Sequence, residues 1–113
     1  MEMECLHLLG HWPTLYMEFE WDESKSQACF EERGFDFAYA AHAFFDPCRW
    51  FKLDDRYEYG EQRFVLMGQV EGRVFVLIYT IRQSAIRIIS ARKANLREIH
   101  QYENSSRQTH PIQ

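Results

Sequence analysis

The second half of the 113-residue chain contains four segments dominated by Val, Ile, Phe and Tyr, joined by short connections. Such residues favour β-strands, and the segments predict four of them: Trp50–Leu53, Arg63–Val70, Arg73–Ile81 and Ala85–Ala91. Glu71-Gly72, between the two longest, is typical of a tight hairpin. A parallel pair needs a crossover of about a dozen residues or more, which these connections lack. The segments therefore predict an antiparallel meander.

Two short helices are predicted before this meander. Asp22 fits an N-cap, and Ser24–Arg33 fits a first helix that ends at Gly34, the residue that best tolerates a left-handed backbone. After Asp36, apolar residues recur at helical spacing over residues 37–44, which predicts a second helix. Helices this short are marginal alone, so we expect both to pack on the sheet.

One more strand and one more helix complete the predicted fold. Glu18–Trp21 alternates polar and aromatic side chains, as a short half-buried strand does. Asn95 and Glu98 resemble a capping box that opens a last helix, reaching about Tyr102. The chain therefore predicts an α+β domain in the order β-α-α-β-β-β-β-α.

The predicted elements fall within one domain. A chain of 113 residues that is 46% hydrophobic suffices for a single core. Residues 1–16 do not share the pattern, and Met17 directly precedes the first strand. We expect a mobile N-terminal extension at residues 1–16, a domain at 17–103 and a flexible tail at 104–113.

Charge is distributed unevenly along the chain. The formal net charge is −4, which on average disfavours nucleic-acid binding. Residues 1–60 hold five Lys or Arg and thirteen Asp or Glu, whereas residues 61–113 hold eight and four. The second half therefore predicts a local anion-binding surface despite the acidic total.

Cysteine usage and hydropathy indicate where the protein works. Cys5, Cys29 and Cys48 are odd in number and widely spaced, which predicts reduced thiols and neither a disulfide framework nor a zinc site. The opening residues lack the cationic start of a signal peptide, and the longest apolar run, Val74–Ile81, is too short to cross a membrane as a helix. We expect a cytoplasmic protein without metal, other cofactor or membrane contact.

Three places on the predicted sheet carry candidate phosphate-binding cations. Arg63 opens a central strand, Arg87 lies in the last strand, and Arg92-Lys93 stands where that strand leads into the last helix. A guanidinium presents a planar fork of donors that suits a phosphate. In a regular strand Arg87 and Arg92 point to opposite faces, so a bulge or a turn is needed to aim both at one ligand. We predict that folding gathers these cations into one pocket.

Glu61 stands two residues before Arg63 and points the same way if the strand begins early enough. It is either a base or orienting partner for Arg63, or half of a solvent-facing ion pair worth less than about 1 kcal/mol. Spacing alone favours the ion pair.

Several segments, in this order and spacing, resemble the BrnT toxins, a family of the RelE-like group. They are F-E-W-D-E-S-K at 19–25, G-F-D-F at 34–37, E-Q-R-F at 61–64 followed by Gly68, and R-I-I-S-A-R-K-A at 87–94 with Glu98 and Tyr102 behind it. The resemblance runs from about Phe19 to Glu103.

The resemblance implies a RelE-like fold and a metal-independent endoribonuclease that inhibits translation. It also implies neutralisation by a BrnA-like ribbon-helix-helix antitoxin, in a hetero-oligomer that contacts operator DNA only through the antitoxin. The candidate catalytic residues are Arg63, Arg87, Arg92, Lys93 and Glu61. The candidate substrate-binding residues are Lys25, Arg97 and Tyr102.

The chain departs from the family pattern in its first helix. The family usually has Lys-His before the closing glycine, where this chain has Glu32-Arg33, and an asparagine is replaced near Cys29. The mechanism implied is that Arg63 and Arg87 hold the scissile phosphate, that Arg92 or Lys93 stabilises charge as the ribose 2′-hydroxyl attacks, and that Glu61 is the remaining base. The alternative is a catalytically inactive partner that acts only as an antitoxin-binding co-repressor.

Overall fold

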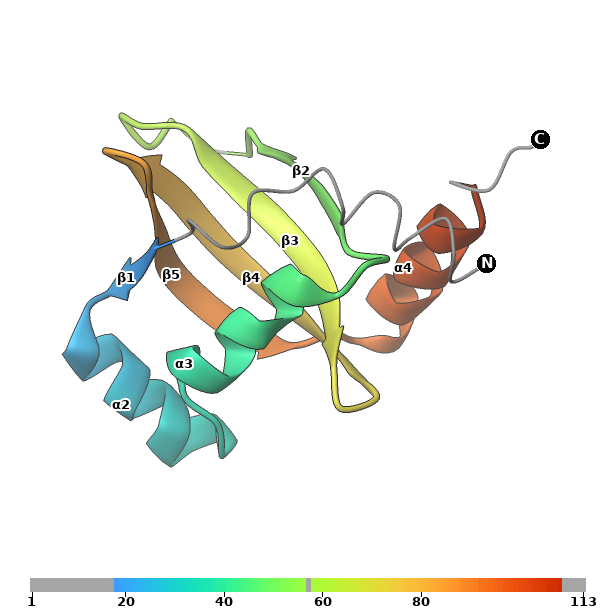
Figure 1. Ribbon diagram of the computed structural model, residues 1–113, viewed down its shortest axis with the longest axis horizontal. Coiled ribbons are helices and arrows are strands. Elements are labelled where there is room, and N and C mark those ends of the chain that lie inside the picture. Colours follow the sequence, from blue (N-terminus) through green and yellow to red (C-terminus); the bar gives the residue numbers. More distant parts are fainter. Residues whose placement is uncertain (1–17, 57, 109–113) are drawn as a thin grey trace.

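The computed structural model describes residues 18–56 and 58–108, and a mixed five-stranded sheet forms its centre (Figure 1). The strands are β1 (Glu18–Trp21), β2 (Trp50–Asp54), β3 (Arg63–Val70), β4 (Arg73–Arg82) and β5 (Ala85–Lys93). Their spatial order is β1-β5-β4-β3-β2. The predicted α+β order and the antiparallel meander of β2 to β5 are confirmed. β1 adds a fifth strand that pairs in parallel with β5.

The two helices after β1 begin and end as their local chemistry predicts. Helix α2 (Glu23–Arg33) starts at Asp22, whose carboxylate accepts the backbone N–H of Ser24 at 2.9 Å. It ends at Gly34, which has a left-handed φ of 88°. The predicted second helix is instead two pieces, helix α3 (Phe37–Ala40) and the 3-10 helix η2 (Ala41–Phe45). Such tightening is common at the C-terminal end of a helix.

Helix α4 (Leu96–Gln108) is longer than the sequence predicted. Its start is the expected capping box, in which Asn95 accepts the N–H of Glu98 at 2.8 Å and Glu98 accepts the N–H of Asn95 at 2.9 Å. The helix continues beyond Tyr102 because no Gly or Pro stands before Pro111. The rest of the predicted tail, from residue 109, and the predicted extension at 1–16 lie outside the described residues.

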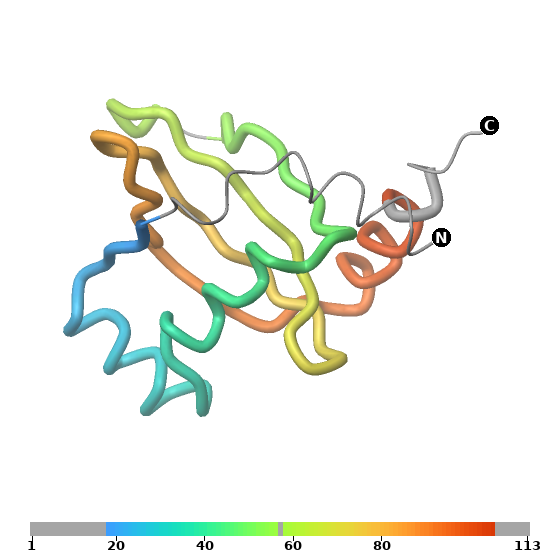
Figure 2. The backbone as a smooth tube through the Cα atoms, in the orientation of Figure 1, coloured from blue at the N-terminus to red at the C-terminus, as the bar shows by residue number. Residues whose placement is uncertain are grey.

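The sheet has two differently covered faces (Figures 1 and 2). On the α2/α3 face, α2, α3 and η2 bury the main core, whose most enclosed members include Phe44, Leu66, Leu77 and Ile88. On the α4 face, α4 packs at one end of the sheet over a smaller cluster of Met67, Val74, Val76 and Tyr102. Since α4 reaches only this end, the rest of the α4 face has no described helix above it.

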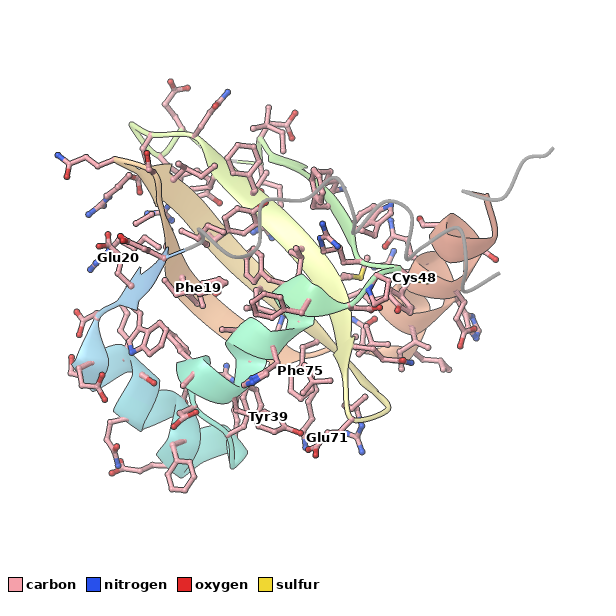
Figure 3. The ribbon with its side chains drawn as sticks, in the orientation of Figure 1. Phe19, Glu20, Tyr39, Cys48, Glu71 and Phe75 are labelled. Atoms are coloured by element: carbon pink, nitrogen blue, oxygen red, sulfur yellow. The ribbon has the colours of Figure 1, made fainter. Side chains whose placement is uncertain are left out.

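Tyr39 anchors α3 to the sheet (Figure 3). Its ring meets that of Phe75 edge-on with centroids 5.9 Å apart, a geometry that aromatic pairs favour. Its hydroxyl donates to Glu71 Oε1 in the β3–β4 hairpin at 2.5 Å. The hairpin thus helps to hold the helical layer in place.

The cysteine prediction holds for one residue and fails for another. Cys29 is a buried free thiol, whereas Cys48 is disulfide-bonded. Cys5 lies outside the described residues. In the part of the chain that the structure describes, none of the helices is long and apolar enough to span a membrane.

Gly68 in β3 is the point of closest approach between the sheet and η2. A Cβ built on Gly68 would lie 2.4 Å from the carbonyl oxygen of Ala43 and 2.9 Å from its Cβ. Both contacts are shorter than atoms tolerate, and the first is with backbone. Glycine is therefore required there for η2 to pack on the sheet.

Gly68→Ala should destabilise the fold by about 2–3 kcal/mol, because η2 has to move away from the sheet to admit the methyl group. Urea unfolding followed by circular dichroism measures this change. The control is Gln69→Ala, an exposed neighbour, which should change the free energy of unfolding by less than about 0.5 kcal/mol. Equal stabilities for the two variants would contradict the close approach.

Candidate active site

Arg63 and Arg87 lie on the α4 face, on either side of Thr80. Arg87 of β5 pairs with Thr80 of β4, and continuing the Phe64–Tyr79 pairing by one residue brings Arg63 beside Thr80 from β3. Because neighbouring strands are about 4.8 Å apart, the Cα atoms of the two arginines are separated by roughly 10 Å. The sheet thus aligns two guanidinium groups from distant parts of the sequence.

Carboxylates stand at both ends of this row. Glu20 of β1 pairs with Arg87, with 3.6 Å between Glu20 Oε2 and Arg87 Nη1. Asp54 of β2 lies opposite Arg63 in the β2–β3 register. The row across the sheet therefore reads Glu20, Arg87, Thr80, Arg63 and Asp54.

A β-bulge brings Arg92 onto the same face as Arg87. The β4–β5 register shifts between Ile78 and Tyr79, so that Arg87 pairs with Thr80 while Arg92 pairs with Val76. Five steps along β5 thus correspond to four along β4, and both arginines face α4. The bulge that the sequence analysis required is present. Four steps of a strand still separate the two arginines by roughly 13 Å.

Lys93 lies on the opposite face. It pairs with Phe75 and lines a cleft with Phe35 and Arg73 on the α2/α3 side of the sheet. The prediction of one pocket shared by Lys93, Arg63 and Arg87 is therefore wrong. The physical reason is that strand alternation resumes after the bulge and points Arg92 and Lys93 to opposite faces.

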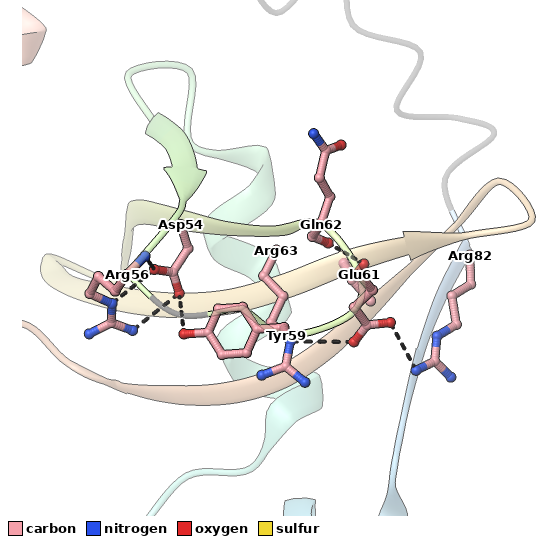
Figure 4. A network of polar contacts seen from close by, with 8 residues as sticks. Asp54, Arg56, Tyr59, Glu61, Gln62, Arg63 and Arg82 are labelled. Atoms are coloured by element: carbon pink, nitrogen blue, oxygen red, sulfur yellow. Dashed lines mark hydrogen bonds and ion pairs between the residues drawn. The ribbon is translucent and has the colours of Figure 1, made fainter.

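Glu61 lies between two arginines (Figure 4). Its Oε2 is 3.3 Å from Arg63 Nε and its Oε1 is 3.3 Å from Arg82 Nη2. Removal of solvent acts to raise the pKa of Glu61, but the hydrogen bonds from Arg82 and Arg63 outweigh it and leave the pKa below its ordinary value. In this state Glu61 is an ion-pair partner and a weak base.

A second polar group supports Arg63 from the loop after β2 (Figure 4). The ring of Tyr59 lies 4.2 Å from the Arg63 guanidinium carbon, close enough for a cation–π contact. The Tyr59 hydroxyl donates to Asp54 at 3.2 Å. Asp54, only 4% exposed, also accepts Arg56 Nε at 2.8 Å and Nη2 at 3.1 Å. Arg63 is therefore held on a preformed scaffold.

Tyr59 and Arg56 belong to this site although the sequence analysis did not select them. They stand in the segment D-D-R-Y-E-Y at 54–59, whose alternation of charge and aromatic side chains was the available signal. Loop residues of this kind have no strand or helix period that predicts where they point.

Arg92 is held by Glu98 at the start of α4. Its Nη1 and Nη2 each lie 2.8 Å from a different oxygen of the Glu98 carboxylate, a bidentate geometry. The hydrogen bond from Arg92 is the main reason why the pKa of Glu98 lies below its ordinary value. The same carboxylate thus caps α4 and orients Arg92.

The candidate substrate-binding residues have different positions. Arg97 lies on α4 at the rim of a cleft that also includes Arg56 and His100. Lys25 is exposed in the first turn of α2, and the described contacts do not bring it to Arg63 or Arg87. Each of these side chains is open to solvent.

Tyr102 is not available to a substrate in this structure, contrary to its selection from the sequence. It is 6% exposed, and its hydroxyl donates to Asp46 Oδ2 at 2.5 Å. The side chain follows Ile99 by three residues, so both lie on the helix face that packs on the sheet. Tyr102 therefore fastens α4 to the sheet.

Within residues 18–56 and 58–108, no three side chains of His, Cys, Asp or Glu are grouped so that they could hold a metal ion.

The comparison with protein families gives a match. The sequence model of the family described as the ribonuclease toxin, BrnT, of type II toxin-antitoxin system matches residues 21–98. This range includes Arg63, Arg87 and Arg92, together with the β-bulge that turns Arg87 and Arg92 to the same face. None of the curated proteins matches the chain.

The buried carboxylate of Asp54 predicts a dependence of stability on pH. Hydrogen bonds from Arg56 are the main cause of its pKa lying below the ordinary 3.8. A pKa that is lower in the folded state stabilises the fold above the unfolded pKa, and this contribution is lost as pH falls through the folded value. The free energy of unfolding should therefore fall as the pH drops through and below the ordinary carboxyl pKa, in part because Asp54 becomes protonated and loses its hydrogen bonds from Arg56.

Asp54→Asn should make this acid-side fall shallower, because the titrating group is gone. The measurement is urea unfolding between pH 6 and pH 3. Asp55→Asn, an exposed neighbour, is the matched control and should retain the wild-type slope. Identical slopes for all three proteins would show that Asp54 does not contribute.

Proposed function

The chain belongs to the BrnT family of ribonuclease toxins of type II toxin-antitoxin systems, and from this premise we propose that its α4 face cleaves RNA at a phosphate held between Arg63 and Arg87. The observation that carries the proposal is the row in which these two arginines flank Thr80. Two guanidinium forks on one face match the charge and shape of a phosphodiester.

In the proposed reaction the ribose 2′-hydroxyl attacks the adjacent phosphorus. The new O–P bond forms as the bond to the 5′-oxygen of the next nucleotide breaks, giving a 2′,3′-cyclic phosphate and a 5′-hydroxyl. Arg63 and Arg87 stabilise the extra negative charge that develops on the phosphoryl oxygens. A base takes the proton of the 2′-hydroxyl, and the departing 5′-oxygen acquires a proton.

Glu61 is the base in this proposal. With Arg63 and Arg82 bound to it, Glu61 is too weak a base, since its pKa lies below the ordinary value. A phosphate that draws the Arg63 guanidinium towards itself weakens one of these hydrogen bonds, and the pKa of Glu61 then rises. Substrate binding would in this way activate the base.

Arg92 and Lys93 are not assigned to the scissile phosphate. Arg92 lies roughly 13 Å along the strand from Arg87, and Lys93 faces the other side of the sheet. Arg63 and Arg87 therefore take both roles, holding the phosphate and stabilising its charge.

A type II toxin has a cognate antitoxin. We expect a BrnA-like ribbon-helix-helix protein that binds the toxin in a hetero-oligomer and contacts operator DNA itself. Cleavage of messenger RNA in the cytoplasm would halt translation, and binding of the antitoxin would prevent it.

One observation favours an inactive co-repressor as the second candidate function. The site arginines are already paired within the chain: Arg87 with Glu20, Arg63 with Glu61 and Arg92 with Glu98. A phosphate has to compete with these carboxylates. Activity of the isolated chain therefore separates the two candidates.

Arg63→Ala and Arg87→Ala should each lower the rate of RNA cleavage by about 100-fold or more, because each removes a donor to the charged transition state. The measurement is single-turnover cleavage of labelled RNA by the toxin freed from its antitoxin, with growth after induction as the cellular readout. Arg73→Gln, an exposed cation on the α2/α3 side, is the control and should cleave like wild type.

Two outcomes contradict the proposal. Wild-type toxin that leaves RNA intact, yet still binds an antitoxin, favours the co-repressor. Cleavage that survives both arginine substitutions places the chemistry elsewhere.

A further inference from the structure

A groove runs between β2 and α4 on the α4 face, next to the row of Arg63 and Arg87. Its inner part, of about 170 Å³, has an apolar floor made by Val65, Met67, Val76 and Ile78. Its outer part, of about 610 Å³, opens along α4 beside Arg97 and His100. Both parts share Lys52, Arg56, Glu98 and Gln101, so they form one continuous cavity, the β2–α4 groove.

Two guanidinium groups from different elements line the inner part. Arg56 comes from the loop after β2 and is fixed by Asp54, while Arg92 comes from β5 and is fixed by Glu98. Their side chains remain 63% and 45% exposed. The two charges are close enough for Arg56 to oppose the protonation of Arg92, although the Glu98 hydrogen bond raises the pKa of Arg92 overall. An anion between them would relieve this repulsion.

Two further cations line the outer part of the groove. Lys52 projects from β2 with its Nζ 5.7 Å from the centre of the Trp50 ring, and Arg97 projects from α4. Among the described residues, no carboxylate lies within ion-pair distance of either side chain. An incoming anion would therefore not have to displace a directly bound described carboxylate from Lys52 or Arg97, although Arg97 is near enough to Glu98 to help lower its pKa.

The carboxylates of the groove are mostly turned to their own partners. Asp54, Asp55 and Glu98 line it beside the four cations. Asp54 accepts hydrogen bonds from Arg56 and Tyr59, and Glu98 accepts them from Arg92 and the backbone of Asn95. These acids orient the guanidinium groups and leave cationic surface towards solvent.

The groove continues directly from the proposed cleavage site. Ile78, on its floor, lies two residues along β4 from Thr80, or roughly 7 Å. Building on the proposed function, we propose that the β2–α4 groove binds backbone phosphates of the single-stranded RNA whose scissile phosphate lies between Arg63 and Arg87. Such contacts hold the strand in register and do not depend on its base sequence.

The test measures binding of 2′-O-methyl RNA, which lacks the attacking hydroxyl and therefore stays intact, by fluorescence anisotropy over a range of salt concentrations. Lys52→Gln combined with Arg97→Gln should weaken binding by about tenfold, since two phosphate contacts are lost. Each lost contact should also reduce the steepness of the salt dependence by about 0.7. Arg73→Gln, on the other face, should bind like wild type.

A second variant provides an independent test if the double variant does not fold. Arg92→Gln removes a cation of the inner groove, while Glu98 keeps its hydrogen bonds with the backbone of Asn95. It should also weaken binding and lower the salt dependence. Circular dichroism establishes that each variant is folded before its affinity is interpreted.

Wild-type affinity and salt dependence in the folded groove variants would overturn the inference. So would variants that lose affinity for the antitoxin alone, because the groove would then be a protein interface. If wild type cleaves RNA but the groove variants bind normally, the inference fails and the proposed function stands. If wild type binds 2′-O-methyl RNA through the groove yet cleaves no RNA, the proposed function fails instead.

Discussion

The register shift between β4 and β5 acts on the core and on the site together. Because five steps of β5 match four of β4, Ile88 and Ala91, three residues apart, both enter the core under α2 and α3. The same shift turns Arg87 and Arg92 to the α4 face. Without the extra residue, one arginine would point into the apolar helical layer, where an unpaired charge is costly. Burial and charge placement are thus satisfied by one local irregularity.

Acidic residues explain how a chain with a formal net charge of −4 presents cations on one face. Glu20, Glu61 and Glu98 each contact an arginine of the α4 face. Partly exposed pairs of this kind add little stability. Their effect is to fix the direction of long side chains, which lowers the entropy that a bound phosphate would otherwise cost. The average charge of the chain therefore says little about its surface.

Turns and helix caps, which depend on residues adjacent in the sequence, were predictable from the sequence. The hairpin at Glu71-Gly72 and the caps at Asp22 and Asn95 follow from local chemistry, and the structure contains all of them. The parallel pairing of β1 with β5 joins segments more than sixty residues apart, and no pattern in the residues next to either strand predicts it. The position of Lys93 depends on where the bulge falls, which packing decides. Helical spacing from Ile99, by contrast, was a usable sign that Tyr102 is buried.

Glu98 links the start of α4 to the arginine that lines the groove. Its carboxylate accepts the N–H of Asn95 and both terminal nitrogens of Arg92. If a ligand draws Arg92 away, the bond to Asn95 still holds the first turn of the helix. Two requirements therefore fall on this one side chain: glutamine would preserve the cap but not the ionic contact with Arg92, and aspartate is shorter than both arrangements require.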